Sequence, residues 1–360
     1  MSAVGAVESS ANLSQAMDRG GPAQPLLIVR NLTKHFPIKA AAFRRGGTVQ
    51  AVDNLTFDIR KGETLAIVGE SGCGKSTVSR LIMALLDPTA GELIFDGEAV
   101  GSRALGLKEY RRQVQMVFQD SYASLNPRLT IQEAIAFGPM VHGADHATAI
   151  TRARDLLSAV GLSPRLFARR YPHELSGGQR QRINIARALA MQPRMLILDE
   201  PVSALDKSVE AQVLNLLMAL KSQFGLTYLF VSHDLNVMHH VADRVMVMYL
   251  GRLAEIGPVE DIFKRPGHPY TRALLASRPS MDPRRRRTEP PLTGDPPNPI
   301  NPPSGCRFRT RCAIAEELCG ASAPQPRPLR GGPEPETVHA AACFALLAES
   351  GHSLAPKAAA

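Results

Sequence analysis

A glycine-rich motif with a lysine and a hydroxyl group constrains this chain most strongly. Residues 69–77 read Gly-Glu-Ser-Gly-Cys-Gly-Lys-Ser-Thr, directly after the apolar run Leu65–Val68 and before a helix that we expect to begin near Thr77. In this strand-loop-helix context, backbone N–H groups and the helix start bind phosphate oxygens, Lys75 reaches the outer phosphates, and Ser76 binds Mg²⁺. A chance glycine turn would not place strand, lysine and hydroxyl in register. The motif therefore predicts a nucleoside-triphosphate site in an α/β core.

Cys73 lies inside this loop and has two interpretations. Positive surroundings would lower the pKa of its thiol and make it reactive; alternatively, it is a small residue tolerated at a variable position. The loop residues expected to contact the nucleotide are Gly69, Ser71, Gly72, Cys73, Gly74, Lys75, Ser76 and Thr77.

Two carboxylates follow a second apolar run, Met195–Leu198. Beside a phosphate-binding loop, the first carboxylate of such a pair belongs with Mg²⁺ and the second can polarise the attacking water. We therefore expect Asp199 to bind the metal and Glu200 to be the general base. Taken alone, an acidic pair after a strand would more often begin a solvated loop.

A second glycine-rich sequence, Leu-Ser-Gly-Gly-Gln, precedes an expected helix over Arg180–Met191. Free N–H groups and the positive end of the helix dipole make such a start a candidate anion site, although a plain capped helix has the same pattern. The residues concerned are Ser176, Gly177, Gly178 and Gln179.

The remaining pattern predicts an α/β fold with a mainly parallel sheet. Further short apolar runs, Tyr228–Val231 and Val245–Tyr249, are typical of strands covered on both faces, and helical patterns such as Ala147–Val160 fill the region from about 120 to 192. We expect a disordered tail over 1–25, a core over 26–265 that contains this helical insertion, and an extended segment over 266–360 rather than more sheet.

These motifs together resemble the nucleotide-binding subunits of ATP-binding cassette (ABC) transporters, whose signature is LSGGQ. The resemblance implies a RecA-like P-loop fold and further roles in this sequence. Phe36 would stack on adenine, Gln119 would contact Mg²⁺ and transmit motion to membrane subunits, and His233 would contact the γ-phosphate. Asp206 would lie in a loop that crosses between two such subunits.

The resemblance also implies a shared site. In that family the signature of one subunit completes the phosphate-loop site of another, so we expect a homodimer or a heterodimer with a paralogous ATPase. The implied cofactors are ATP and Mg²⁺.

Three further stretches narrow the resemblance to ATP-binding subunits of dipeptide and oligopeptide permeases, closest to the dipeptide type. They are Gln119–Pro127, Glu200–Asp206 and the sequence His-Pro-Tyr-Thr-Arg-Ala-Leu-Leu over 268–275. The implied partners are two transmembrane permease subunits and an extracytoplasmic peptide-binding protein. Nickel complexes and glycosides are alternative solutes in the wider family.

The C-terminal segment is rich in proline and cysteine, with 14 of the 28 prolines between Pro279 and Pro335. Its cysteines form a C-x5-C-x6-C-x23-C pattern, which favours a [4Fe–4S] cluster over zinc because a C-x2-C pair is missing. Unmetallated thiols are the third possibility. A run of arginines over 284–287 is either a solvated linker or a contact for anionic head groups. The cysteines are Cys306, Cys312, Cys319 and Cys343.

Composition excludes several other classes. The net charge of +9 suits an acidic partner, but the absence of Trp and an aromatic content of 5% argue against single-stranded nucleic acid. A soluble ABC ATPase acting on DNA or ribosomes is the rival class; it commonly has two cassettes or a coiled insertion, and this sequence shows neither. No apolar run is long enough to span a bilayer and the first 25 residues lack a secretory pattern, so we expect a cytoplasmic chain whose membrane role, if it has one, is peripheral. The resemblance implies that this place is the cytoplasmic face of the inner membrane.

Overall fold

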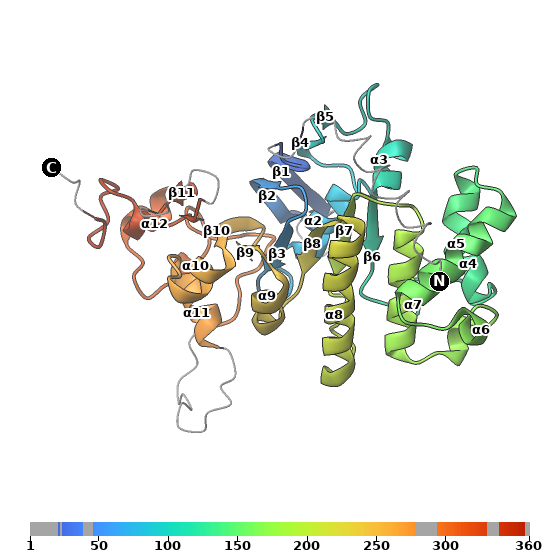
Figure 1. The fold of residues 1–360 in the computed structure, drawn as a ribbon. Coiled ribbons are helices and arrows are strands. Elements are labelled where there is room, and N and C mark those ends of the chain that lie inside the picture. Colours follow the sequence, from blue (N-terminus) through green and yellow to red (C-terminus); the bar gives the residue numbers. More distant parts are fainter. Residues whose placement is uncertain (1–20, 22–23, 39–45, 278–293, 330–337, 357–360) are drawn as a thin grey trace.

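The computed structural model describes residues 21, 24–38, 46–277, 294–329 and 338–356 (Figure 1). The strands are β1 (Leu27–Ile38), β2 (Gly47–Ile59), β3 (Thr64–Val68), β4 (Ala90–Phe95), β5 (Glu98–Ala99), β6 (Val114–Val117), β7 (Met195–Asp199), β8 (Thr227–Val231), β9 (Arg244–Tyr249), β10 (Arg252–Pro258), β11 (Arg327–Pro328) and β12 (Ala340–Ala341). The helices are α2 (Lys75–Ile82), α3 (Leu107–Gln113), α4 (Ile131–Val141), α5 (His146–Ala159), α6 (Pro164–Phe167), α7 (Gly177–Leu189), α8 (Lys207–Phe224), α9 (Leu235–Val241), α10 (Val259–Lys264), α11 (Pro269–Ala276) and α12 (Glu317–Ala321).

The larger sheet positions the predicted site. Its strand order is β11-β12-β10-β9-β3-β8-β7-β6, and the stretch from β9 to β6 is parallel. Every residue of β3, β7, β8 and β9 is buried, as expected for strands with helices on both faces. The four predicted strands are confirmed, each starting within one residue of its expected position.

A second sheet, with the order β2-β1-β4-β5, is antiparallel and was not predicted. Its strands are half-buried, and β1 pairs with β2 through several register shifts. Because bulges of this kind interrupt the two-residue alternation of a strand, the sequence pattern did not reveal it.

Helices α4 to α7 lie between β6 and β7 in the chain and form a group beside β6, at the edge of the larger sheet (Figure 1). α7 packs against β6 and against both α4 and α5. The predicted helices are confirmed, although α7 begins at Gly177 rather than Arg180 and α2 begins at Lys75 rather than near Thr77. Among the described residues, no helix has the length and apolar character needed to cross a bilayer.

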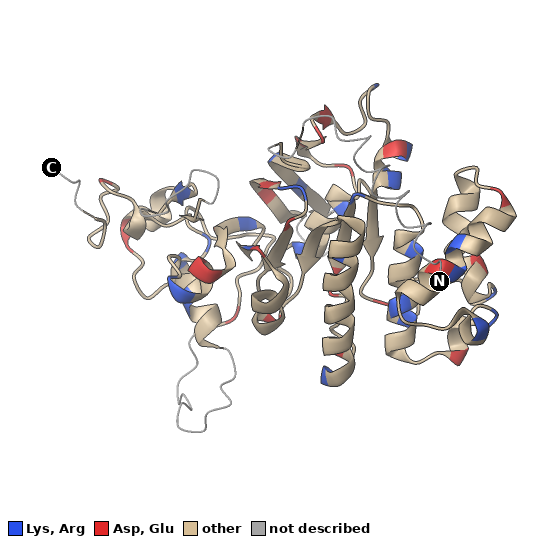
Figure 2. Cartoon of the chain, in the orientation of Figure 1, with Lys and Arg blue, Asp and Glu red and all other residues tan. Residues whose placement is uncertain are grey.

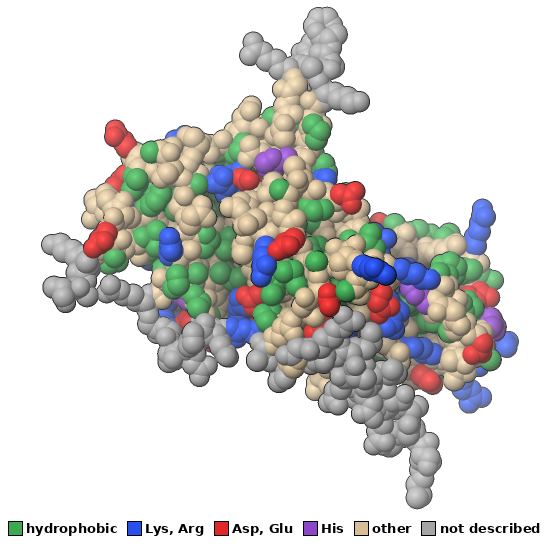
Figure 3. All heavy atoms as spheres, turned by 90° about the horizontal axis from the view of Figure 1, so that it is seen from above, with side chains coloured by type: hydrophobic (Ala, Val, Ile, Leu, Met, Phe, Trp, Pro, Cys, Tyr) green, Lys and Arg blue, Asp and Glu red, His purple; other side chains and the backbone are tan. Residues whose placement is uncertain are grey.

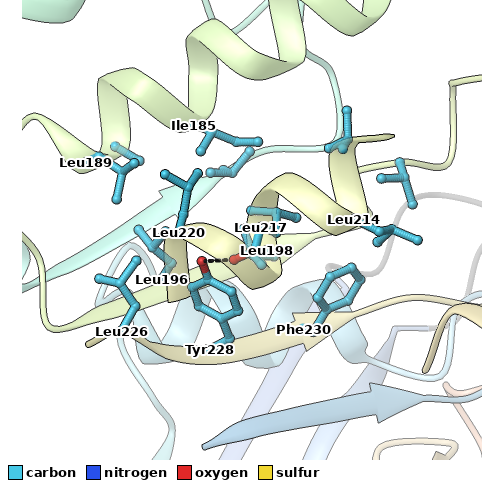
Figure 4. Close-up of a cluster of buried hydrophobic side chains, with 14 of the residues drawn as sticks. Ile185, Leu189, Leu196, Leu198, Leu214, Leu217, Leu220, Leu226, Tyr228 and Phe230 are labelled. Carbon is cyan, nitrogen blue, oxygen red and sulfur yellow. Dashed lines mark hydrogen bonds between the residues drawn. The ribbon is translucent and has the colours of Figure 1, made fainter. Parts of the chain in front are cut away.

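The core between the sheet and α8 is built from large apolar side chains (Figure 4). Leu217 and Leu220 of α8 and Phe230 of β8 are almost fully buried, and the Tyr228 hydroxyl donates a hydrogen bond of 2.8 Å to the carbonyl of Leu217. This bond satisfies the one polar atom that Tyr228 brings into the core. It thereby fixes α8 against the strand that ends next to the site.

The C-terminal segment extends the larger sheet, so the expectation that it adds no sheet was wrong. β12 pairs antiparallel with β10, and β11 pairs with β12. The buried Glu255 of β10 holds this region, because its carboxylate accepts the N–H groups of Gly267 and His268 at the start of α11 and contacts the His339 ring at 2.6 Å. The segment is therefore packed on the core rather than appended loosely, and the boundary at residue 265 remains a prediction.

Charged groups of both signs are spread over the described elements (Figure 2). On the face seen in Figure 3, apolar side chains lie between Lys or Arg and Asp or Glu side chains. The arginine run over 284–287 lies outside the described residues, as does most of the predicted tail over 1–25. The interpretations of these two segments remain predictions.

Candidate active site

The glycine-rich loop joins the end of β3 to the start of α2, as its motif predicts. Gly74 precedes α2 with φ +108°, and a Cβ at this position would lie 2.2 Å from the carbonyl oxygen of Ala51. Only glycine fits there without moving the backbone. The loop is thus wrapped tightly enough for its N–H groups and the N-terminus of α2 to face one anion.

Lys75, the first residue of α2, folds back over the loop. Its Nζ donates to the carbonyl of Gly69 at 2.7 Å and to that of Glu70 at 3.1 Å, and the side chain is buried. A buried ammonium held by carbonyls is poised to exchange them for phosphate oxygens.

Cys73 is buried within the loop, and burial raises the pKa of its thiol even though Lys75 lies near it. The interpretation of Cys73 as an activated thiol was therefore wrong. The residue behaves as a small apolar side chain in a core cluster that contains residues of both sheets.

Two oxygen-bearing side chains that could bind a metal ion lie close together, one at the start of α2 and one at the end of β7. The hydroxyl of Ser76 donates to Asp199 at 3.2 Å. Burial raises the pKa of Asp199, a cost that a bound cation would offset. Hydroxyl and carboxylate oxygens are the ligands that Mg²⁺ prefers, so the residues present fit this ion.

Glu200 is the point at which three distant parts of the chain meet. Gln119, beyond β6, donates to one carboxylate oxygen at 3.0 Å, and His233 Nδ1, beyond β8, lies 3.3 Å from the other. The backbone of Glu200 has φ +48°, a conformation that non-glycine residues adopt rarely. Its side chain is 17% exposed, so the carboxylate is oriented by its partners yet reachable by water.

The second glycine-rich motif forms a separate feature. Ser176 caps α7 by accepting the N–H of Gln179, and the Gln179 side chain accepts the N–H of Ser176 in return. Within the described part of the chain, no hydrogen bond or ion pair joins this motif to the loop over 69–74. Asp206, which precedes α8, is exposed. Ser176 is exposed and Gly177, Gly178 and Gln179 are half-buried, so the start of α7 lies at the surface.

Phe36 lies in β1 opposite Val49 of β2, half-buried, with the ammonium of Lys34 5.2 Å from its ring centre. It therefore belongs to the antiparallel sheet. The expected contact of Phe36 with an adenine base remains a prediction.

The sequence did not reveal the contacts that tie α7 to the segment after Gln119. Asn184 donates to the carbonyl of Ser121 at 2.9 Å, Arg187 donates to the carbonyl of Ser124, and the Arg180 guanidinium lies 5.4 Å from the Tyr122 ring centre. These partners are about 60 residues apart, and no local pattern relates them. A movement of α7 would therefore move the chain that follows Gln119.

The four C-terminal cysteines line one small cavity of about 20 Å³. Burial raises the pKa of Cys343 to about 11, and the neighbouring Cys306, Cys312 and Cys319 add to the shift. In the described ranges, however, no group of three or more His, Cys, Asp or Glu side chains is arranged to hold a metal ion. The expected [4Fe–4S] cluster consequently gains no support from this arrangement.

Comparison with known proteins identifies two family regions. Residues 52–203 match the ABC transporter family, and residues 254–319 match the oligopeptide/dipeptide transporter C-terminal region. A probable peptide ABC transporter ATP-binding protein of Sinorhizobium fredii is 50% identical over 315 residues, which cover 85% of this chain and 88% of that protein. An oligopeptide transport ATP-binding protein of Bacillus subtilis is 48% identical over 308 residues, covering 84% of this chain and 93% of that protein.

Solved structures give the same fold. An ATP-binding cassette in a dimeric post-hydrolysis state with ADP and Pi matches with a TM-score of 0.56 and 32% identity, covering 65% of this chain and 98% of that one. A component of an ABC transporter complex from Clostridium perfringens matches with a TM-score of 0.57 and 28% identity, covering 67% of this chain and 91% of that one.

Proposed function

The chain belongs to the ATP-binding subunits of ABC transporters and is an ATPase, and on that premise we propose that it powers the import of dipeptides or oligopeptides across the cytoplasmic membrane. The observation that carries the peptide assignment is the match of residues 254–319 to the C-terminal region of peptide transporters. The 50% identity to peptide transporter subunits over most of the chain supports it.

ATP binding is assigned to the loop over 69–77. Lys75 would leave the carbonyls of Gly69 and Glu70 for the β- and γ-phosphates, and the N–H groups before α2 would bind the β-phosphate. Ser76, Asp199 and Gln119 would hold Mg²⁺, which neutralises charge on the phosphates when bound. Phe36 would stack on the adenine.

Glu200 is proposed as the general base. Its carboxylate would accept a proton from the water that attacks the γ-phosphate, while Gln119 and His233 keep it aimed at that water. His233 is 59% exposed, which leaves its other ring nitrogen free to contact the γ-phosphate. The convergence of these side chains on one carboxylate supports these roles.

The exposed start of α7 is proposed to act on ATP bound by a second subunit. Ser176, Gly177, Gly178 and Gln179 would face the γ-phosphate held by the partner's loop, and Asp206 would contact the partner. ATP would then close a sandwich of two ATPase subunits, and hydrolysis would open it. The contacts from α7 to the segment over 121–124 supply a route by which that motion reaches membrane subunits.

Affinity purification of the chain from native membranes tests the proposed partners. We expect two multi-span permease subunits, an ATPase subunit and a peptide-binding protein from outside the membrane, with the chain held peripherally on the cytoplasmic face. Recovery with ribosomes or DNA and without a membrane protein would contradict the proposal.

For the four cysteines we propose a [4Fe–4S] cluster first, zinc second and unmetallated thiols third. Four thiolates are a ligand set for such a cluster, and the four residues line one cavity.

Iron and acid-labile sulfide analysis of anaerobically purified protein distinguishes these states. The cluster predicts about four iron and four sulfide per chain, lost in Cys312→Ser and retained in the control Cys73→Ser, because Cys73 lies in the phosphate loop. A folded chain without iron or sulfide rules the cluster out.

A further inference from the structure

The C-terminal segment contacts the phosphate-binding loop at Glu70. Arg311 donates from Nη1 to Glu70 Oε2 at 2.7 Å and from Nη2 to Oε1 at 3.1 Å, a two-point pairing of guanidinium and carboxylate. The Arg311 side chain is 6% exposed. Pairs with this geometry fix both partners in orientation as well as in charge.

A second contact from the same segment holds the backbone of the residue. The N–H of Glu70 donates to the hydroxyl of Tyr270 in α11 at 2.9 Å. The Tyr270 ring packs at a tilt against Tyr249 and Phe308, with ring centres 4.6 and 5.3 Å away, and all three rings are buried. The hydroxyl that accepts from the Glu70 N–H is therefore held by a buried cluster of aromatic rings.

Glu70 also contacts the phosphate-binding lysine, since its carbonyl accepts from Lys75 Nζ at 3.1 Å. Its N–H, its carbonyl and its carboxylate are thus all engaged at once. Glu70 therefore links the C-terminal segment to Lys75.

We propose that Arg311 is a positioning residue for ATP: it holds the loop through Glu70 and cancels a carboxylate charge that would otherwise repel the triphosphate. The inference rests on the proposed ATP-binding role of the loop. Glu70 is six positions after Thr64 at the start of β3 and five before Lys75, so its charge belongs to the loop itself. A single unpaired carboxylate there lowers the attraction for an anion.

This account predicts an order of ATP affinities. Arg311→Gln leaves Glu70 unpaired and raises the KM for ATP by about tenfold or more, with kcat changed by less than about twofold. Arg311→Lys keeps the charge without the two-point geometry, so its KM for ATP lies between those of the wild type and Arg311→Gln. Glu70→Gln combined with Arg311→Gln removes both charges and brings the KM back toward that of the wild type.

Arg309→Gln is the matched control, because Arg309 lies in the same turn but donates to Ser304 within the C-terminal segment. The measurements are steady-state ATPase kinetics and ATP binding by the full chain, with thermal unfolding to monitor folding. A purely structural role predicts that the double variant is no better than Arg311→Gln, and this result would overturn the inference.

Two further outcomes separate the inference from the proposed function. If the wild type binds ATP and Arg311→Gln has the same KM as Arg309→Gln, the positioning role is wrong and the ATPase assignment stands. If the wild type itself binds no ATP at the loop, both are wrong. Where Arg311→Gln does not fold, Arg311→Lys and the double variant give the same comparison.

Discussion

Glu200→Gln is expected to keep ATP binding within about twofold of the wild type and to lower turnover by about 10²- to 10⁴-fold, the range for loss of a general base. Glutamine keeps the size of the side chain and one oxygen that can accept the hydrogen bond from Gln119, while its NH2 group takes the place of the oxygen beside His233. The site therefore keeps its shape. What is lost is the group that accepts the proton from water.

The measurement pairs ATP binding at equilibrium with steady-state hydrolysis. Glu92→Gln is the control, because Glu92 lies on β4 with half of its side chain exposed and pairs with Arg30 at 3.1 Å, away from Glu200. It should behave like the wild type in both assays. Hydrolysis by Glu200→Gln at more than about a tenth of the wild-type rate would remove Glu200 as the base.

Lys75→Ala is expected to weaken ATP binding by about 10²-fold or more, in contrast to Glu200→Gln. The substitution removes the buried ammonium whose hydrogen bonds now run to Gly69 and Glu70 and which would pass to the phosphates. Because ATP must bind before it is hydrolysed, the rate of hydrolysis falls together with the affinity.

Titration with a fluorescent ATP analogue checks this result. Lys108→Ala, on the exposed face of α3, is the matched control and should bind as the wild type does. Retained tight binding by Lys75→Ala would show that the loop is not the main phosphate contact.

The elements that carry the phosphate loop and the acidic pair were predictable because they are local. Four strands of the larger sheet, β3, β7, β8 and β9, are short runs of mostly apolar residues. Because both of their faces are buried, few polar residues can occur in them. The loop glycine at 74 is required by its backbone conformation and by the approach of Ala51.

Contacts between distant residues were not predictable from the pattern. The meeting of Gln119 and His233 at Glu200 was suggested only by the family resemblance, since Gln119 and Glu200 are 81 residues apart. The pair between Arg311 and Glu70 spans 241 residues, and neither residue stands out by itself. Of the two interpretations of Cys73, the small packed residue agrees with the structure, because burial outweighs the positive neighbour and raises the pKa of the thiol.

ATP-driven uptake of labelled dipeptides and oligopeptides into proteoliposomes that hold the complete transporter tests the central claim most directly. The account predicts peptide accumulation that needs ATP, persists with the Glu92→Gln subunit and falls to background with the Glu200→Gln subunit. A wild-type complex that hydrolyses ATP but accumulates no peptide, or uptake unchanged by Glu200→Gln, would contradict it.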